Sequence, residues 1–182
     1  MQVSAAKLLL LSKQREIEAL RTLESRSSLV ATIGSLVHAL QNERGATSIF
    51  LASRGERFED IRRDLAAESG RLEQLLRIEF DERVVADASA SARIYSLLAW
   101  VLLGIDDLPT LRERIEARQL SGDEAIRSIS RLIAGLLSVI FEIADTAITP
   151  EVSRSLVALF NLLNGKELAG QERAIGDRKS VV

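Results

Sequence analysis

The sequence predicts an all-α protein that folds as an antiparallel helical bundle. Apolar residues recur at intervals of three and four in segment after segment, and the strict alternation typical of half-buried strands is absent. Of the 182 residues, 47% are hydrophobic and 4% aromatic, which indicates an aliphatic core. About seven helices with short connections are expected, in one bundle or in two bundles that share a long helix.

Two helices are predicted in the N-terminal third. The first covers residues 4–21, whose apolar side chains lie on one face opposite a charged one. The second is expected to begin at Ser27-Ser28, a possible N-cap, and to run to about residue 51. Arg54-Gly55 should end it.

The third predicted helix covers about residues 58–80 and the fourth about 87–103. Five apolar residues of the third should face inward: Ile61, Leu65, Leu72, Leu75 and Leu76. Arg62-Arg63-Asp64 is expected on its solvated face. On the fourth, Tyr95 and Trp100 are expected to pack in the core.

Prolines and serines mark the expected starts of the last three helices. Residues 106–110 are predicted to form a turn, because Pro109 disfavours helical geometry at the preceding residue and suits the first position of a new helix. Ser121 and Glu124 have the spacing of a capping box, which opens a helix running to about residue 144. Thr149-Pro150 should begin the last helix.

The composition excludes several kinds of chemistry. Without cysteine, and with His38 as the sole histidine, one chain cannot form a thiol or multi-histidine metal site, so no cofactor, metal or catalytic residue is predicted. The 24 basic and 26 acidic residues nearly cancel, which argues against direct nucleic-acid binding. The most apolar stretches, 95–105 and 132–144, are shorter than the roughly 20 residues of a membrane span. A cytoplasmic, non-enzymatic protein is expected.

Two arginines occupy positions where a helical seam requires apolar residues. In the second predicted helix the seam comprises Ile33, Val37, Leu40, Arg44, Thr47 and Leu51. In the last it comprises Leu156, Leu159, Leu163, Lys166, Gly170 and Arg173. Each arginine follows a glutamate and precedes a small residue. Lys166 can reach solvent and is interpreted as structural, and His38 is interpreted as a helix-packing residue.

A buried guanidinium requires an anionic partner, because it cannot lose its charge by deprotonation. Arg44 and Arg173, facing each other, would suit a small planar oxyanion, to which each can donate two parallel hydrogen bonds. Gln41, Thr47 and Ser48 are weaker candidates for completing the site. In the alternative, Glu43 and Glu172 pair with the two arginines, and the chain is a helical dimerisation or interaction module without a small ligand.

Two segments resemble the signatures of the nitrate- and nitrite-sensing (NIT) domain family. The first is Leu36-Val37-His38-Ala39-Leu40-Gln41-Asn42-Glu43-Arg44-Gly45-Ala46-Thr47-Ser48 and the residues after it. The second is Lys166-Glu167-Leu168-Ala169-Gly170-Gln171-Glu172-Arg173-Ala174, and Leu108-Pro109 with Leu111-Arg112 resembles the middle of the domain. The resemblance covers about residues 28–176.

The resemblance implies an all-helical sensor module that, when complete, consists of two associated four-helix-type bundles. It implies nitrate or nitrite bound between helices by Arg44 and Arg173. It also implies a fused output module absent from this chain, such as an RNA-binding antiterminator, kinase, cyclase or chemoreceptor, with a homodimer as one possible assembly.

Three regions are therefore expected. Residues 1–27 form an N-terminal helix, and residues 28–176 form a NIT-like sensor domain that is incomplete at its C-terminal end. Residues 177–182 match what one frame of a sequencing-library adapter would encode, and are expected to be a non-native tail.

Overall fold

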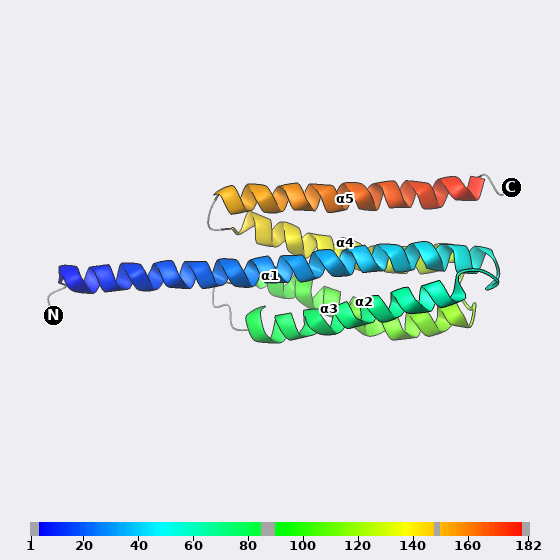
Figure 1. The fold of residues 1–182 in the computed structure, drawn as a ribbon, viewed down its shortest axis with the longest axis horizontal. Coiled ribbons are helices and arrows are strands. Elements are labelled where there is room, and N and C mark those ends of the chain that lie inside the picture. Colours follow the sequence, from blue (N-terminus) through cyan, green and yellow to red (C-terminus); the bar gives the residue numbers. More distant parts are fainter. Residues whose placement is uncertain (1–3, 85–89, 148–149, 180–182) are drawn as a thin grey trace.

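The computed structural model consists of long helices that run side by side (Figure 1). It describes residues 4–84, 90–147 and 150–179, and the side chains of 4–82, 90–147 and 150–172. The α-helices are α1 (Ala5–Ala52), α2 (Glu59–Glu79), α3 (Ala92–Glu116), α4 (Gly122–Asp145) and α5 (Pro150–Lys179). A π-helical turn, Phe80–Val84, extends α2. The described residues contain no strand, which confirms the all-α prediction.

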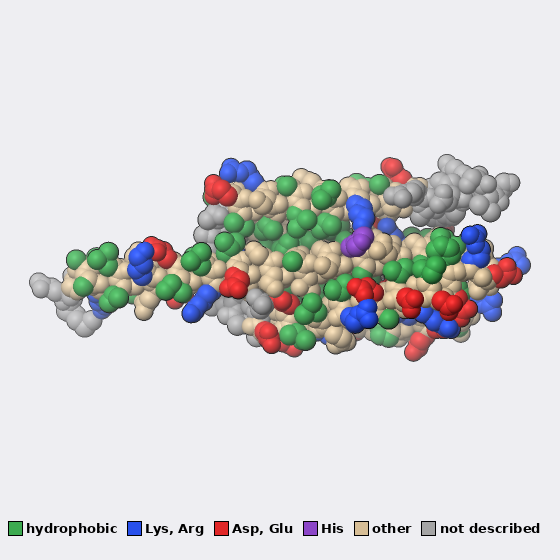
Figure 2. Space-filling model, in the orientation of Figure 1, with side chains coloured by type: hydrophobic (Ala, Val, Ile, Leu, Met, Phe, Trp, Pro, Cys, Tyr) green, Lys and Arg blue, Asp and Glu red, His purple; other side chains and the backbone are tan. Residues whose placement is uncertain are grey.

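Helix α1 is one continuous helix where two were predicted. Ser28 does not cap a helix, because its Oγ donates a hydrogen bond to Glu79 Oε1 at 2.8 Å, and Ser27 lies in mid-helix beside it. No glycine or proline interrupts the chain near these serines, so nothing in the sequence breaks the helix. The N-terminal part of α1 projects beyond the other helices (Figure 1) and exposes hydrophobic side chains (Figure 2).

Helix α3 also joins two predicted elements, since the expected turn at 106–110 is helical and Pro109 lies inside it. Proline in a helix interior costs about 3 kcal/mol. Burial of Ile105, Leu108 and Ile115, each no more than 2% exposed, holds both sides of the proline in the core and offsets that cost. With these two mergers, seven predicted helices become the five α-helices of the described residues.

The expected core positions of Tyr95 and Trp100 are wrong, since the two residues are 43% and 53% exposed. They lie on α3, which packs mainly against α4 and leaves an apolar face in solvent. By length and composition alone α3 could cross a membrane, with a mean hydropathy of 1.4 over its most apolar window. One such helix is weak evidence, and the Arg112 end of α3 pairs with Glu43 of α1 within the bundle.

Helix α2 is rotated relative to its prediction, although Leu76 is buried and Leu72 packs against the core as expected. Ile61 and Leu75 are 48% and 44% exposed, whereas Arg62, expected in solvent, is 2% exposed. The buried residues of α2 are mostly polar: Arg62, Ser69, Glu73, Leu76 and Glu79. Contacts between these polar residues and other helices therefore determine which face of α2 points inward.

The core lies mainly between α1, α3 and α4, with further side chains from α2 and α5 against it. The seam of α1 is buried as predicted, because Ile33, Val37 and Leu40 are all 0% exposed. The capping box of α4 is also confirmed, with the Ser121 side chain and the Glu124 carboxylate each bonded to the backbone of the other residue. The predicted cap Thr149 lies outside the described residues, and α5 begins at Pro150.

Candidate functional site

Helix α1 buries two adjacent residues of opposite charge. Glu43 is 2% exposed and Arg44 is 5% exposed. Consecutive residues on an α-helix point about 100° apart. The two charges accordingly meet different neighbours: Glu43 contacts α2 and α3, and Arg44 contacts α4 and α5.

The Arg44 guanidinium is held by one hydroxyl and one carboxylate. Its Nη1 donates to Ser130 Oγ on α4 at 2.6 Å and to Glu167 Oε1 on α5. The side chains of Arg44 and Glu167 are 6% and 5% exposed, so the pair is buried. A hydrogen-bonded partner of opposite charge is what a guanidinium in a core position requires.

The Glu167 carboxylate accepts hydrogen bonds from two further side chains. Gln41 Nε2 donates to Glu167 Oε2 at 3.0 Å, and Gln171 Nε2 donates to Glu167 Oε1 at 2.8 Å. Donors from α1 and α5 therefore converge with Arg44 on one planar, delocalised anion. This cluster has the donor chemistry of an oxyanion site.

Close approach of α5 to the guanidinium depends on Gly170. A Cβ built at Gly170 would lie 2.9 Å from Arg44 Nη2, closer than carbon and nitrogen normally approach. Any larger residue at this position would require the guanidinium to move. A small residue in the second signature segment, three positions before Arg173, therefore makes room for Arg44.

A pocket of about 430 Å³ opens beside this cluster between α1 and α5. Of the predicted residues, Gln41, Arg44 and Ser48 line it, together with Lys166 and Gly170. Thr47 is 1% exposed but is not among the residues that line the pocket. The structure thus brings three of the four α1 candidates to one cavity.

Arg173 falls within α5, but its side chain lies outside the described part of the chain. The alternative predicted Glu43 or Glu172 as the partner of Arg44, and this partner is wrong, because Arg44 pairs with Glu167. Glu43 pairs instead with Arg112 of α3, and Glu172 is exposed.

Arg112 links three buried acceptors on the far side of α1. Its Nε donates to Glu43 Oε1 at 2.8 Å, and its Nη2 donates to Glu43 Oε2, Ser69 Oγ and Glu73 Oε1 at 3.0, 2.9 and 2.7 Å. Burial alone would lower the pKa of Arg112, but hydrogen bonds and charge attraction from Glu43 and Glu73 outweigh burial and raise it. The network fixes α2 and α3 to α1, one residue from Arg44.

Sequence reasoning missed the partners in both clusters: Ser69, Glu73, Ser130 and Glu167, and the role of Arg112. Glu167 and Arg112 do lie in the segments with family resemblance. The remaining signal is the i, i+4 spacing of Ser69 and Glu73, which places two polar residues on one face of α2.

Lys166 and His38 are both exposed, and Lys166 Nζ contacts His38 Nδ1 at the surface (Figure 2). This exposure confirms that Lys166 reaches solvent. The position of His38 differs from that of a packed core histidine, because its ring lies outside the buried seam.

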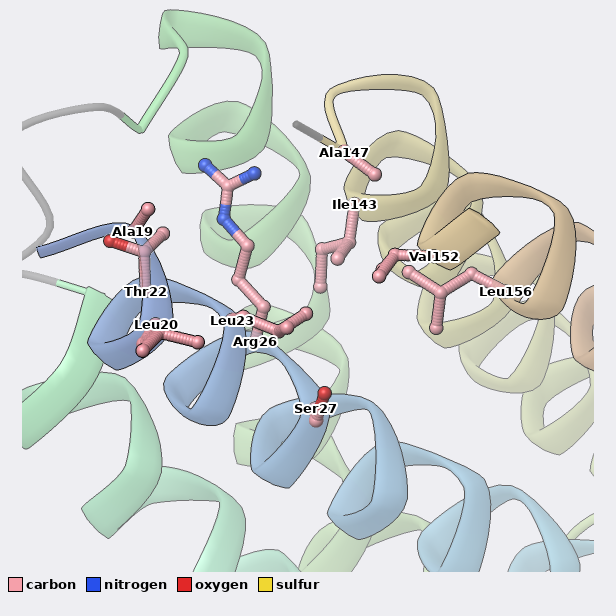
Figure 3. A pocket seen from close by; sticks show the side chains of 10 residues that line it. All are labelled: Ala19, Leu20, Thr22, Leu23, Arg26, Ser27, Ile143, Ala147, Val152 and Leu156. Carbon is pink, nitrogen blue, oxygen red and sulfur yellow. The ribbon is translucent and has the colours of Figure 1, made fainter. Parts of the chain in front are cut away.

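A second pocket, of about 120 Å³, lies where α1 passes the end of α4 and the start of α5 (Figure 3). Its lining is mainly apolar, with Leu23, Ile143, Val152 and Leu156 among the side chains drawn there. A small oxyanion requires several converging donors, so this pocket does not suit one. The Arg44 pocket has such donors in the buried guanidinium and the amides beside it, and is the better candidate of the two.

Comparison with known proteins identifies the family. The sequence profile described as "Nitrate and nitrite sensing" matches residues 35–178. The chain is 34% identical over 165 residues to the nitrate regulatory protein of Klebsiella oxytoca, a match covering 91% of this chain and 41% of that protein. It superposes on the solved structure of the NasR transcription antiterminator with a TM-score of 0.83 and 30% identity, covering 94% of this chain and 46% of that one.

The chain spans less than half the length of both relatives. Its own match to the family profile nevertheless extends over most of its residues, and the matched region contains the Arg44 cluster, the Arg112 network and the whole of α3 and α4. The chain therefore belongs to the nitrate- and nitrite-sensing (NIT) family.

Proposed function

We propose that this chain is a non-enzymatic regulatory module that binds nitrate or nitrite at Arg44, between α1 and α5. The observation that carries the proposal is the buried Arg44 guanidinium, which lines a pocket among amide and hydroxyl side chains in a member of this family. A guanidinium stays charged at any physiological pH, so such a site binds an anion without proton transfer.

The donors around Arg44 suit a planar anion. Glu167 presents two oxygens of a delocalised carboxylate to this cluster, and nitrate and nitrite offer oxygens of the same kind. Gln41 and Ser48 line the same pocket and supply further polar groups. Arg173, three residues beyond Gly170 on α5, is proposed as the second arginine on the strength of the family signature.

The proposal extends to the rest of the signalling pathway. One relative is named a nitrate regulatory protein and the other a transcription antiterminator. By analogy, anion binding in this module controls an output module of the antiterminator type in the cytoplasm. Such control requires that the anion bind one arrangement of the helices more tightly than another.

Isothermal titration calorimetry with nitrate and nitrite tests the site. The wild-type chain should give saturable heat, and Arg44→Ala should abolish it, because the variant removes the charged donor. Arg154→Ala is the matched control, since this arginine is exposed on α5 and pairs only locally with Glu151 among the described residues. Loss of binding in the control, or unchanged binding in Arg44→Ala, would refute the site.

One observation favours the second candidate, a helical interaction module without a small ligand. Arg44 already has a buried carboxylate partner, as a purely structural arginine would. In that case nitrate leaves the melting temperature unchanged relative to chloride at equal ionic strength. A melting temperature that rises with nitrate concentration above the chloride control excludes the second candidate, because an anion that binds the folded state stabilises it.

A further inference from the structure

The carboxylate of Glu167 occupies the donors that an anion bound at Arg44 Nη1 would need. It accepts hydrogen bonds from Arg44 Nη1, Gln41 Nε2 and Gln171 Nε2. Its side chain is 5% exposed, so water does not satisfy it in place of these donors. Arg44 Nη1 is also bonded to Ser130, which leaves this nitrogen without a further hydrogen to donate.

Resting on the function proposed above, we propose that Glu167 is an internal competitor of the anion, a built-in carboxylate that the ligand must displace from Arg44. A carboxylate and a nitrate or nitrite ion are planar, singly charged and delocalised, so they compete for the same guanidinium donors. Two anions bound to the same guanidinium nitrogen would also repel each other in this buried cluster.

Displacement of Glu167 also changes how α5 is attached to α1. Its two carboxylate oxygens bond to two residues of α1, Arg44 and Gln41, and therefore connect the helices at this level. When the anion takes over these donors, the direct connection between α1 and α5 is replaced by one through the ligand. The carboxylate then turns into the adjacent pocket, which Lys166 lines.

The competition lowers the apparent affinity for the anion. If the anion binds only molecules in which Glu167 has left Arg44, its apparent dissociation constant equals the intrinsic constant divided by the fraction of such molecules. Because Arg44 and Glu167 are a hydrogen-bonded pair of opposite charge, they stay paired in most molecules. Glu167 thus sets the concentration at which the module responds.

Nitrate calorimetry on Glu167→Gln tests the proposal. Glutamine keeps the shape of the side chain and can still accept a hydrogen bond, but a neutral acceptor bonds the guanidinium more weakly than a carboxylate. We expect nitrate to bind Glu167→Gln about tenfold or more tightly than wild type. Adding Arg44→Ala to this variant should abolish binding.

The matched control is Glu172→Gln, which removes the same charge from an exposed position of the same helix. It should change the dissociation constant less than twofold, roughly, since exposed charges are screened by solvent and salt. Circular dichroism spectra of all variants establish that each is folded. An equal gain of affinity in Glu172→Gln would overturn the proposal, because net charge would then explain it.

The outcomes separate this proposal from the proposed function. If wild type binds nitrate and Glu167→Gln binds equally or more weakly, Glu167 is not a competitor while the sensor function stands. If neither protein binds nitrate, the sensor function fails and the competitor with it. On the wild-type chain, nitrate should also shift the side-chain amide resonances of Gln41 and Gln171, and unshifted resonances at saturation would contradict displacement.

Discussion

Removing Arg112 tests how far the polar network beneath α1 stabilises the fold. Arg112 makes four hydrogen bonds, two to Glu43 and one each to Ser69 and Glu73. Arg112→Met keeps the aliphatic length but leaves two carboxylates, whose side chains are 2% and 6% exposed, without their cation. Breaking a buried ion pair in this way costs about 3–5 kcal/mol.

The assay is urea unfolding followed by far-ultraviolet circular dichroism. At about 2–4 °C per kcal/mol for a chain of this size, the same loss lowers the melting temperature by about 6–20 °C. Arg114→Met, at an exposed position two residues along α3, is the control and should change stability by less than about 0.5 kcal/mol. Adding Glu43→Gln to Arg112→Met should recover part of the loss, because one uncompensated carboxylate is removed. A loss below about 1 kcal/mol in Arg112→Met would refute the reasoning.

Three further predictions concern single contacts. Arg62 is 2% exposed and stacks over an aromatic ring, and its Nη2 lies 3.9 Å from a carboxylate oxygen of the half-exposed Glu116. Its Nε and Nη2 have no hydrogen-bond partner among the described residues. Because this long ion pair compensates burial poorly, Arg62→Met should leave stability unchanged or raise it in urea unfolding, and a loss above about 2 kcal/mol would contradict this. Gly170→Ala should weaken nitrate binding, because its Cβ would lie 2.9 Å from the Arg44 guanidinium. Gly165→Ala is the control and should not weaken binding, since the space around Gly165 is open. Equal titration curves for the two variants would rule out the close approach of α5 to Arg44. Hydrogen bonds from the Ser121 side chain and backbone lower the pKa of Glu124 below its ordinary value of 4.5, so this cap stabilises the fold above pH 4.5 and its contribution is lost as the pH falls through the lowered pKa. In Ser121→Ala, carboxyl NMR titration should show the pKa of Glu124 return toward 4.5. An unchanged pKa would count against the capping box.

The sequence predicts those features that depend on neighbours within one helix. The buried seam of α1 and the burial of Arg44 follow from the three- and four-residue spacing of Ile33, Val37 and Leu40. The start of α4 follows from the Ser121–Glu124 spacing. In each case the residues that decide the structure lie within two turns of one another.

The features that sequence reasoning missed depend on contacts between helices. From Leu163, a step of three leads to Lys166 and a step of four to Glu167, so spacing permits either residue on the inward face of α5. The structure buries Glu167 because Arg44 of α1 faces it. Ser28, likewise, has the chemistry of a helix cap, but its hydroxyl bonds to Glu79 on a different helix.

The rotation of α2 has the same cause. Facing Ile61 and Leu75 inward would satisfy the apolar pattern of α2 alone. The observed rotation places Ser69 and Glu73 against Arg112, which adds two acceptors to the ion pair that Arg112 forms with Glu43. The hydrogen bonds and charge attraction between α2 and Arg112 of α3 therefore outweigh the burial of Ile61 and Leu75.

A crystal structure of the chain with nitrate would test whether the anion binds at Arg44 and displaces Glu167. We expect a planar anion between α1 and α5, within hydrogen-bonding distance of the Arg44 guanidinium, with the Glu167 carboxylate moved off Nη1. An anion bound elsewhere at saturation, with Arg44 still paired to Glu167 and Ser130, would contradict it.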